Sequence, residues 1–285
     1  MVQPGMKRTG TLLLLALLVS GPAMAAAQDS THENPFGRGK KDRFGISAGS
    51  YLMTFGSSAR VDSDQGSGTS IDLEDDTGLP TDRNELRVDG YWRFSRKHRL
   101  DFSTFFFRRE ATRILDREIM FGDATYEIGG ELHTQLDTTW LKLAYRYSFV
   151  RNARVDAGFS AGLSTYAESF ELEGQGSVSG GPGGQFVTES EDVVAPIPVL
   201  GLHAEVLLGA NVYFKGSADY FGISISDIKG SLLDLRGDVL WYPFRHFGFG
   251  AGYNFVRREF KDTSGTTVDV EIDYEGALVY ASYVW

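Results

Sequence analysis

Apolar and polar residues alternate with a period of two through most of the chain beyond residue 43. In the segment 141–149, one face carries Leu141, Leu143, Tyr145, Tyr147 and Phe149. The other face carries Lys142, Ala144, Arg146 and Ser148. Successive side chains of a β-strand point to opposite faces, so this alternation predicts strands rather than helices.

Ten segments show the pattern and are the predicted strands. They are 44–56, 84–95, 98–111, 132–150, 153–171, 195–208, 210–226, 231–244, 247–261 and 268–285. Strands of soluble sheets commonly have about five or six residues, whereas a membrane-crossing strand needs about 9–11. The pattern therefore predicts about ten membrane strands, with eight or twelve as alternative counts.

The connections between these segments alternate in length. Tight connections are expected at Arg96-Lys97, Arg151-Asn152, Gly209 and Arg245-His246. The other connections are 57–83, 112–131 and 172–194, with shorter ones near 227–230 and 262–267. Short periplasmic turns and longer outer loops are typical of outer-membrane barrels. Aromatic residues also gather beside the tight turns, as in the girdle of such barrels. They are Trp92, Phe94, Tyr147, Phe149, Trp241, Phe244, Phe247, Tyr283 and Trp285.

The polar face favours a membrane barrel over a soluble β-sandwich or a lipocalin-type barrel. The soluble folds also alternate, but they bury the apolar face. Here the polar face carries mid-strand charges and many glycines, and the apolar face has almost no charge. Hydrocarbon cannot hydrogen-bond an open strand edge, so a sheet in the membrane must close. We predict an all-β fold, a transmembrane antiparallel up-and-down β-barrel over 44–285.

The N-terminal residues have the pattern of an export signal. Lys7 and Arg8 precede an apolar run from Leu12 to Val19, and small residues follow it. This run is shorter than the about 20 residues that span a bilayer, so a signal peptide over 1–27 is predicted, cleaved after Ala25 or Ala27. Residues 28–43 would then form a short periplasmic segment. The predicted location is the cell outer membrane.

Composition excludes several classes of protein. The chain has no cysteine, so it has no disulfide framework and no thiol site. Its net charge is −10, and removing Lys7 and Arg8 makes it −12, which argues against nucleic-acid partners. No later segment is apolar enough for a transmembrane helix. We expect no cofactor and no metal.

Four passages carry a resemblance to known proteins. The last strand ends Tyr280-Ala281-Ser282-Tyr283-Val284-Trp285, which resembles the C-terminal signal read by the outer-membrane assembly machinery. The stretches Ser70–Pro80, Tyr91–Phe94 and Lys97–Asp101 resemble a group of outer-membrane β-barrel-domain proteins. The resemblance covers about 44–285 and implies location and fold but no activity. It implies contact with outer-membrane lipid and lipopolysaccharide, and we expect a monomer.

If the polar face points inward, its charges nearly balance, with eight positive and seven negative residues. The predicted lumen network is Arg87, Asp89, Arg93, Arg99, Asp101, Lys142, Arg146, Arg154, Asp156, Glu205, Lys215, Asp219, Asp234, Arg236 and Asp238. Unpaired buried charge is costly, so near-balance favours ion pairs across a narrow lumen. Such a lumen would be closed or would pass only small solutes, or the network would be purely structural.

Two loops and one histidine suggest alternative functions. The first long loop is acidic, and its spacing does not match a calcium-binding loop, so solvated charge is the simpler interpretation. The glycine-rich stretch 173–185 reads as a mobile outer loop without a phosphate-binding lysine. His133 is the one histidine expected near the outer rim, close to Asp137.

The first hypothesis is therefore a non-catalytic barrel, structural or a narrow small-solute channel. The second is a surface-binding adhesin or receptor acting through acidic outer loops. The third is a lipid or peptide hydrolase active at the rim.

Overall fold

The computed structural model describes residues 43–62, 68–121, 124–178, 185–209, 211–264 and 267–285. The predicted signal peptide and almost all of the segment 28–43 lie outside the described residues. Within them, no helix is long and apolar enough to cross a membrane.

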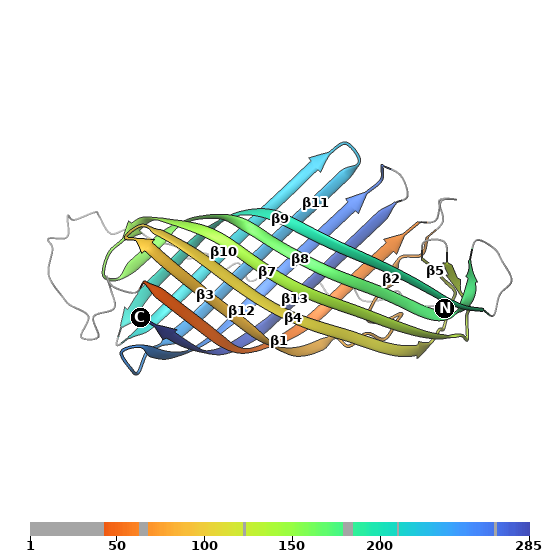
Figure 1. Ribbon diagram of the computed structural model, residues 1–285, viewed down its shortest axis with the longest axis horizontal. Helices are drawn as coiled ribbons and strands as arrows, with labels where there is room; N and C mark the ends of the chain where they lie inside the picture. The colour runs from red at the N-terminus through yellow and green to blue at the C-terminus, as the bar shows by residue number, and fades with distance from the viewer. Residues whose placement is uncertain (1–42, 63–67, 122–123, 179–184, 210, 265–266) are drawn as a thin grey trace, which may run out of the picture. The chain divides into compact units, whose positions relative to one another are not determined.

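Ten long strands and three short ones make up the described fold (Figure 1). The long strands are β1 (Phe44–Val61), β3 (Asp82–Ser95), β4 (His98–Ile114), β7 (Glu131–Arg151), β8 (Val155–Val178), β9 (Gln185–Gly209), β10 (Val212–Ile225), β11 (Ile228–Trp241), β12 (Phe247–Asp262) and β13 (Val268–Val284). The short strands are β2 (Ile71–Asp72), β5 (Ile119–Phe121) and β6 (Ala124–Tyr126).

The long strands close into an antiparallel barrel. Sequential strands are hydrogen-bonded to one another, and the first strand pairs with the last, β1 with β13, from Gly45↔Val284 to Val61↔Val268. The pairing of β8 with β9 completes the ring. The predicted closed barrel of ten strands is confirmed, and closure leaves the membrane-spanning part of the sheet with few open edges.

The two faces of the wall lie as the alternation predicts. Outward-facing Leu143 and Phe159 are 55% and 57% exposed, whereas inward-facing Tyr51 is fully buried. Trp92, Trp241 and Trp285 are exposed beside the tight-turn end, and Phe44 stacks between Trp92 and Trp285. An apolar belt bordered by exposed aromatic rings is the surface that a bilayer requires.

Several strands are longer than the sequence predicts. The expected loop 172–194 is mostly strand, because β8 continues to Val178 and β9 begins at Gln185. β1 likewise continues to Val61, and the loop 112–131 contains β5 and β6. Residues 188–192 are all polar, so the alternation that marks a strand disappears there.

The wall has a seam between β9 and β10. Their pairing ends at Leu200↔Tyr220. Beyond this pair, β9 extends from Val199 back to Gln185, and β10 extends to Ile225. In Figure 1 the tip of the β10–β11 hairpin stands away from the long β8–β9 hairpin. Two prolines, Pro196 and Pro198, lie in the stretch of β9 that pairs with β8 but not with β10. Proline has no backbone N–H, so strands tolerate it at such edges.

The end of the barrel with tight turns is closely packed. Ser148↔Gly158 lies beside a bulge where β7 has one extra residue against β8. A Cβ on Gly158 would lie 1.9 Å from the Tyr147 carbonyl oxygen and 2.8 Å from the His203 ring. Only glycine fits this close approach of the two backbones.

Gly158→Ala is therefore expected to destabilise the barrel by about 1–3 kcal/mol, because the backbone must shift to admit the methyl group. Gly56→Ala is the matched control, since a Cβ there meets nothing within 4 Å. Urea unfolding in lipid vesicles, followed by heat-modifiable gel migration, measures the difference. Equal midpoints for the two variants would contradict the packing argument.

Candidate functional site

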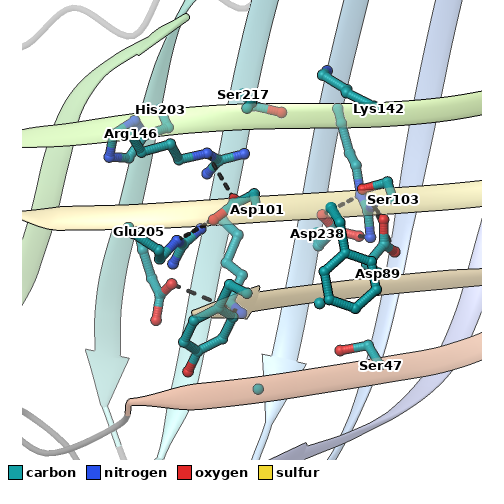
Figure 2. Close-up of a pocket in the computed structure, with 18 of the residues that line it drawn as sticks. Ser47, Asp89, Asp101, Ser103, Lys142, Arg146, His203, Glu205, Ser217 and Asp238 are labelled. Carbon is teal, nitrogen blue, oxygen red and sulfur yellow. Dashed lines mark hydrogen bonds and ion pairs between the residues drawn. The ribbon is translucent and has the colours of Figure 1, made fainter. Parts of the chain in front are cut away.

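The lumen near the tight-turn end is polar and crossed by ion pairs (Figure 2). It encloses a cavity of about 120 Å³ lined by charged side chains from β3, β4, β7, β8, β9, β10 and β11. Ligand pockets for drug-sized molecules hold about 300–1,000 Å³, so this space suits a few water molecules.

Lys142 is a central cation of this layer. Its Nζ lies 2.8 Å from Asp219 of β10 and 2.8 Å from Asp234 of β11. Two strands, β8 and β9, separate β7 from β10 in the wall, so these contacts cross the lumen. Ser160 donates to Asp219 at 2.8 Å and Asn254 donates to Asp234 at 2.7 Å. Each buried carboxylate therefore has more than one partner, as its burial requires.

Arg236 makes the second crossing, which is an ion pair between strands on different sides of the lumen. It lies 3.0 Å from Asp89 of β3 and 2.8 Å from Asp238 of its own strand, β11. Arg87 completes this group by donating to Asp89 at 3.2 Å and to Asn254 at 2.8 Å. The Arg87 guanidinium also lies over the Trp140 ring, 4.8 Å from its centroid. Charge is thus paired between walls that the chain order places far apart.

The third group lies closest to the tight turns. Asp101 accepts two hydrogen bonds from Arg99 and lies 2.8 Å from Arg146, whose side chain points toward it in Figure 2. Arg93 and Arg151 both donate to Asp156, at 2.8 Å and 3.1 Å.

The structure brings fourteen of the fifteen predicted lumen residues to the inner wall. The exception is Arg154, which lies exposed in the turn between β7 and β8, because β8 begins only at Val155. Lys215 and Glu205 face each other at a looser 3.8 Å.

Sequence reasoning missed a second set of inward charges nearer the outer end. Arg258 of β12 pairs with Glu168 of β8 at 2.6 Å across the lumen. Arg109 of β4 is fully buried and pairs with Glu74. Strand parity alone could have found Arg109, Glu168 and Arg258, since each shares its face with predicted lumen residues.

Aromatic rings fill the middle of the lumen, where only polar side chains were expected. Tyr166 of β8 and Tyr274 of β13 meet with their hydroxyls 3.0 Å apart. Four strands separate β8 from β13 in either direction around the ring, so these two tyrosines join opposite walls. Phe105 and Trp140 stack beside them, with ring centroids 4.8 Å apart. This aromatic layer narrows the lumen above the polar cavity.

The acidic segment at the outer end is folded and paired. Asp72 accepts hydrogen bonds from the backbone N–H groups of Glu74 and Asp75, as a helix N-cap does, and Gly78 ends the short turn at φ 79°. Asp76 pairs with Arg117, and Glu74 with buried Arg109. The expectation of a solvated acidic loop holds for Asp72 and Asp75, which are exposed, but not for Glu74 and Asp76, which pair with Arg109 of β4 and with Arg117 of the following loop.

A second apolar cluster packs beneath this segment at the outer end. Ile71, Leu79, Ile119, Tyr126 and Leu172 are almost completely buried in it. Burial raises the pKa of the Tyr126 hydroxyl, which donates to the Leu172 carbonyl at 3.1 Å. Nearby, the Arg60 guanidinium beside Asp62 lowers the pKa of that carboxyl. The cluster holds the acidic segment against the mouth of the barrel.

The rim shows little that resembles a catalytic set. His133 contacts the Thr112 hydroxyl at 3.0 Å, while Asp137 forms an ion pair with Arg108 at 2.5 Å. In the part of the chain that the structure describes, no group of three or more His, Cys, Asp or Glu residues could hold a metal ion.

The closed wall, the apolar belt and the tight-turn end with its aromatic rings define an outer-membrane β-barrel protein. The resemblance to outer-membrane barrels noted from the sequence is confirmed at this level. No protein-family model and no curated protein matches the chain.

The solved structures with a similar chain fold include outer-membrane barrels. Ail, the attachment invasion locus protein of Yersinia pestis, is 13% identical with a TM-score of 0.29, covering 83% of this chain and 98% of Ail. The P. putida toluene transporter TodX is 6% identical with a TM-score of 0.35, covering 88% and 92%. CymD, a monoaromatic hydrocarbon channel, is 8% identical with a TM-score of 0.38, covering 86% and 89%. At these values the likeness carries no argument about function.

Lys142→Met is expected to destabilise the barrel by about 3–5 kcal/mol, because Asp219 and Asp234 lose their shared cation while remaining buried. Adding Asp219→Asn and Asp234→Asn removes the uncompensated charges and should recover most of that loss. Urea unfolding in vesicles compares the single and triple variants. A single variant as stable as the parent would show that the crossing has no energetic weight.

Proposed function

We propose that the protein is a non-catalytic barrel of the cell outer membrane whose resting lumen passes water and, at most, very small solutes. The observation that carries this is the set of contacts between opposite walls, above all Tyr166 with Tyr274 and Arg258 with Glu168. The polar layer below adds the Lys142 and Arg236 crossings. A solute moving along the axis must displace all of these contacts.

The energetics support a closed resting state. A carboxylate left unpaired in a narrow interior costs several kcal/mol, so each crossing resists opening unless water replaces the lost partner. The cavity of about 120 Å³ lies within the polar layer. Delivery through the predicted signal peptide, assembly through the C-terminal strand and a monomeric state complete this proposal.

Planar-bilayer recording tests it directly. The parent protein should show no large, stable conductance. Removing the crossings between opposite walls with Tyr166→Ser, Glu168→Ser, Arg258→Ser and Tyr274→Ser leaves the net charge unchanged and should open steady conductance, because smaller polar side chains let water fill the middle of the lumen.

The control removes an ion pair of the same kind from the outer face. Arg108→Ser with Asp137→Ser removes an exposed ion pair and should leave the barrel without large conductance. Heat-modifiable gel migration verifies that both variants are folded. A large conductance in the parent would overturn the closed-lumen proposal.

The seam between β9 and β10 favours a second candidate function, the lateral exchange of small apolar molecules with the outer leaflet. Apolar side chains border it outside, with Val194 68% exposed and Leu200 71% exposed, and Ile197 and Phe221 pack toward the aromatic interior. About nine paired residues of β10 lie below it, close to the height of the apolar band. Pro196 and Pro198 lack the backbone N–H groups that another strand would need to pair with this edge.

Uptake of a monoaromatic hydrocarbon by cells with an intact outer membrane tests this candidate. Expression should speed uptake, and Ile197→Arg should abolish the gain, because it places a charge at the inner lip of the seam. Ser169→Arg, on the outer face of β8, is the matched control. Equal uptake with and without the barrel would exclude the lateral route.

A further inference from the structure

The charges of the lumen are not evenly distributed along it. The layer around Lys142, Arg87 and Arg236 holds three cations and four carboxylates, those of Asp89, Asp219, Asp234 and Asp238. The layer next to the tight turns, together with Arg154 in the exposed turn beside it, holds six cations and three carboxylates. These are Arg93, Arg99, Arg146, Arg151, Arg154 and Lys215 against Asp101, Asp156 and Glu205. Positive charge therefore accumulates at the tight-turn end, which faces the periplasm in barrels of this class.

A second cavity of about 60 Å³ lies in this positive layer and adjoins the lumen cavity, with which it shares Asp156, Glu205 and Lys215. Its lining also includes Arg93, Arg151 and Arg154. The volume is about half that of the neighbouring lumen cavity, which suits one small ion. It belongs to the short-turn mouth, below the crossings that close the lumen.

The cations here lack enough carboxylate partners. Arg93 and Arg151 share a single oxygen, Oδ2 of Asp156, and each side chain is only 10% exposed. The buried Nη1 of Arg93 has no hydrogen-bond partner among the described residues. The Arg154 side chain, exposed at the edge of the same cavity, makes no ion pair with any described residue.

A buried arginine with an unsatisfied donor is costly, and the simplest compensation is an anion from outside the chain. Arginine forks match the oxygens of phosphate-type anions, which accept several hydrogen bonds at once. Two carboxylates also line the cavity, but Oδ2 of Asp156 is shared by Arg93 and Arg151, and Glu205 faces Lys215 at 3.8 Å. The cations outnumber these carboxylates, so the cavity keeps a net positive charge.

We propose that this periplasmic mouth is a binding site for one phosphate-type oxyanion, held by Arg93, Arg151 and Arg154. The anion is either free phosphate or the phosphate of a phospholipid headgroup in the inner leaflet. The site goes beyond the proposed function, since it lies below the crossings and does not require the lumen to conduct.

Calorimetric titration of the folded, full-length barrel tests the site. One arm adds inorganic phosphate to protein in a phosphate-free detergent, and the other adds a short-chain phosphatidylglycerol below its micelle-forming concentration. Saturable binding with one anion per barrel is expected in at least one arm, and the tighter arm identifies the source.

Arg151→Met and Arg154→Met together should weaken binding at least about tenfold, because they remove two of the charge-assisted donors. Arg96→Met removes a charge from the exposed turn between β3 and β4 at the same end and should change affinity less than about twofold, as a distant screened charge does. Arg93 is left intact, since it also anchors Asp156.

Three results would overturn the proposal. They are the absence of saturable binding in both arms, affinity unchanged in the double variant, and equal losses in the double variant and Arg96→Met, which would indicate diffuse surface charge. Heat-modifiable gel migration like that of the parent verifies that the double variant is folded. If it is not, Arg151→Lys with Arg154→Lys keeps the charge but removes the fork and should weaken binding by a smaller factor.

Discussion

A strand edge in hydrocarbon has no partner for its N–H and C=O groups, and this constraint determines the rest of the molecule. It forces β1 to pair with β13 and β8 with β9, so ten strands make a cylinder of small circumference. In a cylinder this narrow, side chains from opposite walls touch, as Tyr166 and Tyr274 do. The interior is therefore a core with its own packing and electrostatic requirements, although it is built from the polar face.

Those requirements explain how the interior is layered. A long cation such as Lys142 can reach two carboxylates on the far wall, and small residues such as Ser160 and Gly201 leave room for them. Further out, the larger rings of Phe105 and Trp140 exclude water from the middle of the barrel. Pairing and packing thus act together: the ion pairs hold the walls in one register while the rings fill the space between them.

The sequence predicted the fold well and the interior only in part. Alternation over segments such as 141–149 identified the strands and their lipid-facing side, because in the membrane one face must be apolar. It failed for 185–194, because residues 188–192 are all polar and the period vanishes. It placed fourteen of fifteen charges in the lumen yet could not assign partners, since pairing across the barrel depends on shear and tilt. The aromatic layer was missed because Tyr166 and Trp140 share a face with polar residues.

The uneven charge along the lumen follows from the same geometry. Near the middle, carboxylates of β10 and β11 reach Lys142 of β7, and Arg236 of β11 reaches Asp89 of β3, so charge is neutralised internally. At the tight turns the strands end and the walls offer fewer opposite residues, so Arg93 and Arg151 converge on the one carboxylate of Asp156. An excess that is unfavourable in the middle of the barrel is tolerable at its mouth, because water or an anion can reach it. The paired charges of the middle and the positive mouth thus depend on the same quantity, which is the distance that side chains can reach to form ion pairs between facing walls.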